Sequence, residues 1–223
     1  NLIDQATGKS EQAIEATTGD LNFDARQEVR LANDNLVALI APSEGGQIYE
    51  LDVRSICHNL LATLQRRPEA YHRKVLHGPS EAGDNVASIH DRVVFKQEGL
   101  DERLQYDDHA PKSLIDRFLA DDATADQLAS AAAQEFGEFM GRPYETKLRK
   151  NPDRIQVVMN RSATAFDVPI TITKGVTLAA GSRTIDIAYL LEGLPQDRTM
   201  HFAVEFNFAG LPSGADDRYF YRG

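Results

Sequence analysis

The sequence contains one cysteine, no tryptophan and no long apolar run, and each absence excludes a class of protein. Cys57 is the single cysteine among 223 residues, so the chain cannot form an internal disulfide or a zinc site built on several thiolates. Because free cysteine is among the most buried residue types, we expect Cys57 to be a small buried side chain. A chain without disulfides is typical of a reducing compartment, which predicts a cytoplasmic location. No apolar stretch approaches the ~20 residues that cross a bilayer, so we expect no membrane span.

Positive charge is also scarce. The 24 Lys and Arg residues are outnumbered by 34 Asp and Glu residues, which gives a formal net charge of −10. A protein that binds nucleic acid or an anionic membrane surface carries a basic patch, so neither is an expected partner. A neutral sugar is compatible with this charge, although the missing tryptophan removes the usual flat platform of a starch-binding module. The histidines show no zinc-binding spacing, and there is no Gly-rich phosphate loop or G-x-S-x-G motif.

The C-terminal third carries the clearest pattern, in which apolar and polar residues alternate. The apolar positions are Ile155, Val157 and Met159; Ile170, Ile172, Val176 and Leu178; Ile185, Ile187, Tyr189 and Leu191; and Phe202, Val204, Phe206 and Phe208. Four segments of period two, separated by turn residues, predict antiparallel strands with one buried face. Upstream, the apolar run 36–40, the turn 42–46 and the segment 47–52 predict a hairpin. The fold class is therefore mainly β, an antiparallel β-sandwich.

Two segments show helical spacing and predict a helical insertion in this sandwich, at about 53–75 and 112–140. The apolar positions that carry this spacing are Ile56, Leu60, Leu61 and Leu64 in the first segment, and Leu128, Ala132 and Phe136 in the second. Pro68 ends or kinks the first segment, and the stretch Asp122-Ala123-Thr124 offers a capping residue in the second.

The other segments complete the predicted organisation. Residues 1–19 are polar and small, which predicts a linker or N-terminal arm, and 20–223 form the sandwich domain. Residues 77–84 are an expected loop and 87–95 an expected strand. The chain begins at Asn1 instead of Met, so we expect a fragment of a longer protein.

Several segments, taken in order, carry a family resemblance. They are Glu28–Asp52, Asn59–His72 with its RRPEAYH stretch, Ser88–Asp91 (SIHD), Leu104–Asp107 (LQYD), Ser113–Asp116 (SLID) and Ala203–Asn207 (AVEFN). Over roughly residues 20–221 they resemble the C-terminal β-sandwich of α-amylase and 4-α-glucanotransferase type enzymes of glycoside hydrolase family 57.

The resemblance implies a function for the whole protein more than for this chain. Family members are similar to retaining enzymes that act on α-1,4-glucans, with a Glu nucleophile and an Asp acid/base on an upstream (β/α)7 barrel. Their C-terminal sandwich is similar to the galactose mutarotase-like supersandwich. The resemblance therefore implies a non-catalytic domain that supports its own upstream catalytic barrel and contacts an α-glucan or oligosaccharide. It also implies further strands beyond Gly223, so we expect the domain to be truncated there.

One loop has the spacing of a calcium site. Asp20, Asn22, Asp24 and Glu28 form D-x-N-x-D-x-x-x-E, and the main-chain carbonyl of Arg26 occupies the position that supplies a backbone ligand in such loops. Ala25 stands where these loops favour glycine for a sharp turn. The alternative is a solvated acidic turn that leads into a strand.

Two other polar clusters are candidates for binding. His201, Glu205 and Asn207 share one face of the last predicted strand, which suggests contact with carbohydrate; an ordinary solvent-exposed face is the alternative.

The second cluster consists of Arg66, Arg67, Tyr71 and His72, which we interpret as an interdomain contact or as ordinary surface charge. Asp107 and Asp108 are adjacent carboxylates, which point to opposite faces if that segment is extended. We therefore expect them to form hydrogen bonds and caps instead of a catalytic pair.

Two other functions remain open from the sequence. A stand-alone mutarotase-like sugar enzyme would need a general acid and a general base on opposite sides of its sugar. An oligosaccharide-binding module would need a binding face but no such pair.

Overall fold

The computed structural model describes residues 13–76, 101 and 104–210, which belong to two compact units. The described parts of Asn1–Thr63, Pro111–Asp122 and Gln134–Gly223 form the first, which we call the β unit. The described parts of Leu64–Ala110 and Ala123–Ala133 form the second, which we call the small unit.

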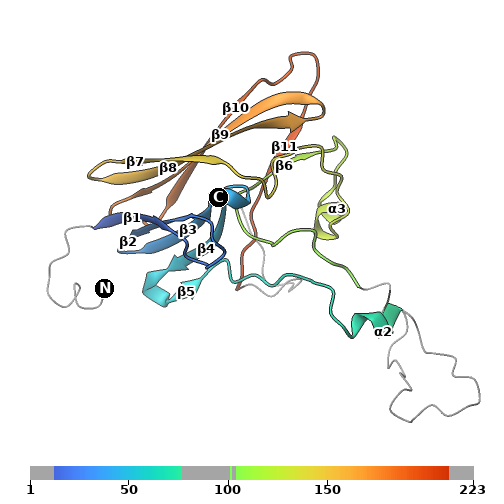
Figure 1. The fold of residues 1–223 in the computed structure, drawn as a ribbon, viewed down its shortest axis with the longest axis horizontal. Helices are drawn as coiled ribbons and strands as arrows, with labels where there is room; N and C mark the ends of the chain where they lie inside the picture. Colours follow the sequence, from blue (N-terminus) through green and yellow to red (C-terminus); the bar gives the residue numbers. More distant parts are fainter. Residues whose placement is uncertain (1–12, 77–100, 102–103, 211–223) are drawn as a thin grey trace, which may run out of the picture. The chain divides into compact units, whose positions relative to one another are not determined.

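Two larger sheets and a two-stranded ladder build the β unit, all of them antiparallel (Figure 1). The first sheet has the order β1 (Ile14–Gly19), β2 (Glu28–Asn33), β3 (Leu36–Ala41), β4 (Gln47–Val53) and β5 (His58–Asn59). The second has the order β10 (Ile185–Glu192), β9 (Val168–Ala179), β8 (Arg154–Ala165) and β7 (Glu145–Lys150). The ladder pairs β11 (His201–Glu205) with β6 (Ile115–Leu119). Because β1 packs on β8 and β2 on β9, the larger sheets form a sandwich, and the predicted fold class is confirmed.

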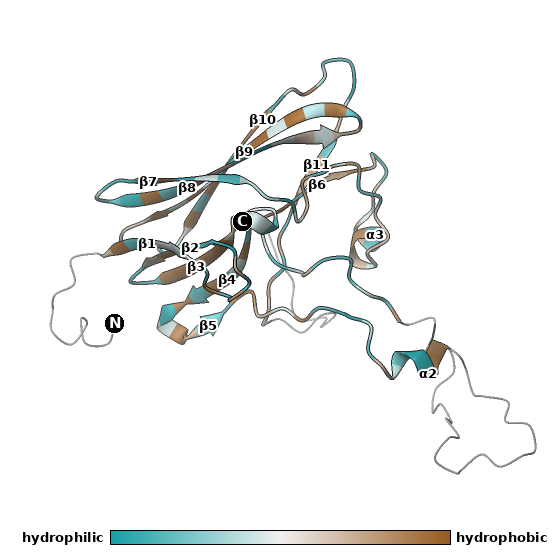
Figure 2. Cartoon of the chain, viewed as in Figure 1, coloured by the Kyte–Doolittle hydropathy of each residue, from teal (hydrophilic) through white to brown (hydrophobic). Residues whose placement is uncertain are grey.

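The core lies between these sheets and follows the alternation predicted from the sequence. Its fully buried members on β8 and β9 are Val157, Met159, Ile172, Val176 and Leu178. Opposite them, β2 and β3 bury Leu31, Ala38 and Ile40. Figure 2 shows the same alternation along β10 as brown and paler bands.

The predicted hairpin at 36–52 is confirmed as β3, the 3-10 helix η1 (Pro42–Glu44) and β4. Gly45 ends η1 in the left-handed region with φ 75°, and Gly46 follows with φ 61°. A Cβ on Gly46 would lie 2.7 Å from the Met159 sulfur and 2.8 Å from Lys174 Cε. The turn therefore packs directly on β8 and β9, which excludes larger residues from this position.

The structure differs from the predicted arm at residues 1–19. Residues 14–19 form β1, which pairs with β2 at the edge of the first sheet, while residues 1–12 lie outside the described part of the chain. The strand is short, with only Ile14 and Ala16 packed against the core, so its alternation was too brief to stand out in a polar segment.

The predicted helix at 53–75 is wrong over most of its length. A 3-10 helix, η2 (Arg54–Ile56), is followed by Cys57 with a left-handed φ of 50°, which reverses the chain so that β5 pairs with β4. The side chain of Asn59 accepts hydrogen bonds from the amides of Leu51 and Leu61, which competes with helix formation. The only α-helix of this segment is α2 (His72–Leu76) in the small unit. Cys57 is exposed, contrary to its expected burial.

The predicted helix at 112–140 is wrong over most of its length, and the α-helix found there is α3 (Ala125–Ala129) of the small unit. Of the predicted capping stretch 122–124, Thr124 is the N-cap, in a reciprocal capping box with Gln127. Ala131 then adopts φ 57°, which ends the helical path before Phe136. The preceding part of the segment is β6, which is buried at every position and so shows no alternation by which a strand is recognised.

Some predictions fall outside the described residues. These are the loop at 77–84, the strand at 87–95 and the SIHD segment at 88–91. Within the described residues, none of the helices has the length and apolarity needed to span a bilayer.

Replacing three glycines by alanine should lower stability by different amounts, because they differ in backbone conformation and in the space around them. Gly193, after β10, has φ 83°, and a Cβ there would lie 2.5 Å from the carbonyl oxygen of Pro169. Gly141 has φ 65° with open space around it, and Gly19 has neither feature. We expect Gly19→Ala to change the free energy of unfolding by less than about 0.5 kcal/mol and Gly141→Ala to cost about 1–2 kcal/mol. Gly193→Ala should cost clearly more, because backbone must also move. Urea unfolding measures all three, and equal losses at Gly141 and Gly193 would contradict the predicted clash.

Candidate functional site

The loop that joins β1 to β2 contains the predicted calcium ligands. One side-chain oxygen from each of Asp20, Asp24 and Glu28 lies within 4.8 Å of the other two. The Asp20 carboxylate accepts hydrogen bonds from the amides of Asp24 (3.0 Å) and Ala25 (3.1 Å). Asn22 lies in the same loop, where its Oδ1 accepts from the Asp24 amide and its Nδ2 donates to Asp24 Oδ2. The structure therefore brings all four predicted side chains together.

Within this loop, Glu28 differs from its neighbours in burial. Asp20 and Asp24 are exposed, whereas Glu28 is 0% exposed as the first residue of β2. Its Oε2 accepts from the amide of Leu21 at 2.8 Å, while its Oε1 is buried without a hydrogen-bond partner. The hydroxyl of Tyr49 on β4 is also buried without a partner. Burial first, and then the charges of nearby acids including Glu28, raise the pKa of Tyr49 to about 12.

The residues of the predicted carbohydrate face form polar contacts within the protein. His201 Nδ1 lies 3.1 Å from the carbonyl oxygen of Ala120. Asn207 Nδ2 donates to Glu205 Oε1 at 2.7 Å and to the carbonyl of Lys112 at 2.9 Å. All three side chains are partly exposed, and these contacts give them structural roles at the end of the ladder. Carbohydrate contact remains a prediction.

The predicted interdomain cluster lies in the small unit, and its members differ in how many hydrogen bonds they form there. Arg66 donates to the Asp107 carboxylate from its amide (2.7 Å) and from Nε (2.8 Å), and to the carbonyl of Ala129 at 2.9 Å. Although burial alone would raise it, these hydrogen bonds and the Arg66 charge lower the pKa of Asp107. Asp107 therefore acts as a hydrogen-bonding residue, as predicted. His72 Nδ1 lies 3.1 Å from the hydroxyl of Tyr106.

A buried polar network at the centre of the β unit was missed from the sequence. The Lys174 ammonium, 0% exposed, donates to Asp116 Oδ2 (2.8 Å) and to the carbonyls of Gly45 (2.7 Å) and Leu114 (3.0 Å). The Asp116 carboxylate also accepts from the hydroxyls of Tyr144 (2.6 Å) and Tyr189 (2.5 Å). All three ammonium protons are thus used, and the network joins the β3–β4 turn, β6, β9 and β10.

The electrostatics of this network favour a fixed ion pair. Burial lowers the pKa of Lys174, and the Asp116 charge opposes that shift. Burial, followed by the Asp116 charge, raises the pKa values of Tyr144 and Tyr189, so both hydroxyls stay protonated and donate. Such a network holds three sheets in register and offers no free group to a substrate.

A buried arginine of the ladder is paired with two partly exposed carboxylates. Arg117 on β6 is 2% exposed and donates from Nε to Glu135 at 3.1 Å and from Nη1 to Glu205 at 3.0 Å. Despite its burial, hydrogen bonds and charges from both carboxylates raise the pKa of Arg117. Burial raises the pKa of Glu135 although Arg117 and two backbone amides oppose that shift.

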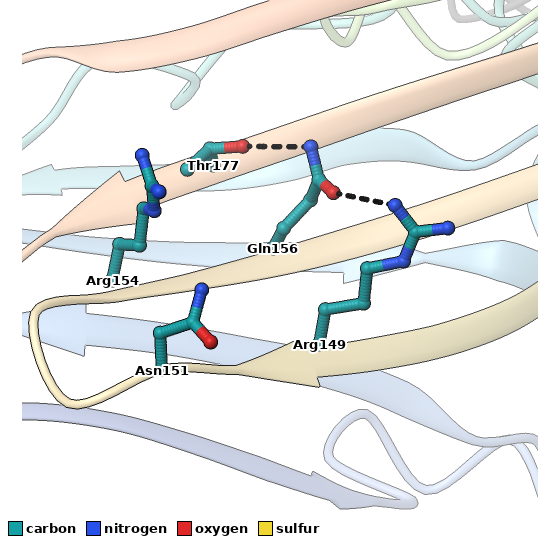
Figure 3. A pocket seen from close by; sticks show the side chains of 5 residues that line it. All are labelled: Arg149, Asn151, Arg154, Gln156 and Thr177. Carbon is teal, nitrogen blue, oxygen red and sulfur yellow. Dashed lines mark hydrogen bonds between the residues drawn. The ribbon is translucent and has the colours of Figure 1, made fainter.

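Among the hollows that the described residues line, two lie at the second sheet and the segment that follows it. One, of about 240 Å³, is lined by residues of β7, β8, β9 and the β7–β8 turn, where Gln156 bridges Arg149 and Thr177 (Figure 3). The other lining residues are Asn151 and Arg154. The other, of about 130 Å³, is lined by Leu191, Leu194, Pro195, Arg198, Met200 and Phe202. Neither lining contains a carboxylate, so neither hollow holds the acid and base pair that glycoside hydrolysis requires.

Comparison with known proteins places this fold in a family. The family described as alpha-amylase/4-alpha-glucanotransferase, C-terminal, matches residues 20–223. A 4-alpha-glucanotransferase of Thermococcus kodakarensis is 30% identical over 191 residues, which cover 85% of this chain and 28% of that protein. Alpha-amylase 1 of Dictyoglomus thermophilum is 25% identical over 202 residues, covering 90% of this chain and 29% of that protein.

A solved structure supports the same family. The crystal structure of 4-alpha-glucanotransferase from Thermococcus litoralis matches with a TM-score of 0.68 and 26% identity, over 89% of this chain and 30% of that one. This chain thus spans less than a third of the length of these relatives. The family resemblance inferred from the ordered segments is confirmed: the chain belongs to the C-terminal domain family of α-amylases and 4-α-glucanotransferases.

Proposed function

We propose that this chain is a non-catalytic accessory domain of an enzyme that acts on α-1,4-glucans, and that it packs against a catalytic barrel encoded upstream. The observation that carries the proposal is the match of residues 20–223 to a C-terminal domain family whose members are far longer enzymes. Membership of glycoside hydrolase family 57 and a cytoplasmic location are part of the same proposal. The exposed thiol of Cys57 suits a reducing compartment.

The geometry supports a structural role. Among the described residues, the buried charged groups Asp116 and Lys174 pair with each other, and the buried Arg117 pairs with Glu135 and Glu205. Each is engaged in internal pairs that a substrate would have to break. A general acid or base needs a proton that its substrate can reach, so these pairs are suited to holding sheets together.

Each unit, taken by itself, has exposed side chains that are candidates for contact with the barrel. Phe206 and Phe208, at 44% and 45% exposure, stack with ring centroids 6.3 Å apart after β11. In the small unit, Arg67 and Tyr71 are exposed and remain candidates for the interdomain contact, whereas Arg66 is held by Asp107.

Three assays with the purified chain test the proposal. We expect no release of reducing ends from amylose, no acceleration of α-glucose mutarotation in polarimetry, and no more than weak retardation in a starch-containing native gel. Amylose turnover would overturn the non-catalytic role, and faster mutarotation would favour a mutarotase-like enzyme. Strong retardation without turnover would favour an oligosaccharide-binding module.

A further inference from the structure

We propose that the loop joining β1 to β2 binds one calcium ion. Its carboxylate ligands are Asp20, Asp24 and Glu28, with the amide oxygen of Asn22 in the same loop. Calcium–oxygen bonds measure about 2.3–2.6 Å, so one ion reaches two oxygens up to about 5 Å apart. The three carboxylates satisfy that limit, because their ligand oxygens all lie within 4.8 Å of one another.

The unpartnered oxygen of Glu28 points to a ligand. Glu28 is completely buried, and its Oε1 has no hydrogen-bond partner. The other oxygen of the same carboxylate binds the amide of Leu21, so this carboxylate lies against the loop. A buried carboxylate oxygen without a donor or cation is costly, and a bound cation supplies what it lacks.

Asp116, the other buried acid among the described residues of the β unit, shows what is missing here, because it is paired with Lys174. The partly exposed acids Glu135 and Glu205 are likewise paired, with the buried Arg117. Across the described residues, no Lys or Arg side chain forms an ion pair with Asp20, Asp24 or Glu28. Three carboxylates less than 5 Å apart repel one another, and a divalent cation removes that repulsion.

The loop backbone has the shape that such a site needs, despite the unusual residue in it. Ala25 adopts φ 66°, the left-handed conformation for which these loops favour glycine. The donor set contains oxygen only and includes exposed groups that leave room for water. Calcium accepts six to eight oxygens in irregular geometry, whereas magnesium demands a near-ideal octahedron, so calcium fits better.

Binding would fasten the edge of the first sheet. Gly19, the last residue of β1, pairs with Glu28, the first residue of β2, and the loop closes this hairpin. An ion held by Asp20 and Glu28 therefore fixes the closing end of the edge strand. We expect calcium to slow amide hydrogen exchange in 14–19 and to leave β8 and β9 unchanged.

Titration of the chelator-treated 223-residue chain tests the site directly. We expect calorimetry with calcium chloride to give one site per chain, a rise in Tm, and slower exchange in β1. Competition with terbium gives a second readout, because terbium also binds oxygen ligands and calcium should displace it from the same site.

Matched variants assign the ligands. Asp24→Asn and Glu28→Gln should each weaken calcium binding more than about tenfold, and Asp186→Asn, an exposed acid on β10, should not. Ala25→Gly keeps every ligand and relieves the left-handed alanine, so it should bind at least as tightly. Asp24 is exposed, so its variant folds even if Glu28→Gln does not. Absence of heat and of exchange protection at millimolar calcium would overturn the proposal, as would undiminished binding in both ligand variants.

Discussion

Replacement of Lys174 by methionine is expected to destabilise the β unit by about 3–5 kcal/mol, because it leaves the Asp116 carboxylate buried without its cation. Asp116 is 1% exposed and would keep only the two tyrosine hydroxyls as donors. Loss of the ammonium also removes the donors to Gly45 and Leu114 carbonyls. Urea unfolding followed by far-UV circular dichroism measures the loss.

Two further variants separate the buried charge from packing. Lys147→Met, at an exposed position of β7, should change stability by less than about 0.5 kcal/mol. Lys174→Met combined with Asp116→Asn removes both charges and keeps an acceptor for the tyrosines, so it should recover a large part of the loss. A double variant no more stable than Lys174→Met would show that packing, not charge, sets the cost.

The position of Lys174 carries a sequence signal, but its partner does not. Lys174 falls in phase with Ile172 and Val176 on the inward face of β9, and a lysine in that phase requires a buried counter-ion. Asp116 lies 58 residues away on a strand buried at every position, where alternation cannot distinguish strand from helix. Only the three-dimensional pairing of these strands brings the two together.

The predicted strands and helices differ in reliability for a physical reason. The long strands β8 and β9 place several apolar residues on one face, so period two is clear. The predicted helices rest on fewer positions, and exposed Ile56 and Leu64 imitate a helical stripe in a segment that reverses direction at Cys57. Left-handed Cys57 and Ala131 have no sequence signal, since such residues rarely adopt this conformation.

The acidic loop could be predicted from the spacing of its residues, whereas the burial of Glu28, which makes the loop a candidate site, could not. The intervals among Asp20, Asn22, Asp24 and Glu28 are visible in the sequence. The burial of Glu28 follows from its place at the start of β2, beneath an edge strand that the sequence did not reveal. Likewise, Glu205 and Asn207 share a face as predicted, but their internal partners Arg117 and Lys112 come from the neighbouring strand and the segment that leads into it.

The second large effect is expected for Arg117→Met, and it should depend on pH. Without the guanidinium, the Glu135 carboxylate loses the cation that pairs with it, at a cost of about 3–5 kcal/mol near neutral pH. Burial already raises the pKa of Glu135, and Arg117 opposes that shift, so its removal raises this pKa further. A folded-state pKa above the unfolded value lowers stability as pH rises through the window between them. The deficit of the variant relative to the original chain should therefore shrink as the pH falls from 8 toward 5.

Unfolding curves at several pH values between 5 and 8 measure this deficit. Arg183→Met, at an exposed position, is the matched control and should change stability by less than about 0.5 kcal/mol at every pH. Replacing Glu135 by glutamine in the Arg117→Met background removes the group that titrates most strongly, so it should recover stability at pH 8 and flatten the pH dependence. A deficit that stays constant with pH, or grows toward pH 5, would contradict the assignment of Arg117 as the counter-ion that keeps the Glu135 carboxylate ionised.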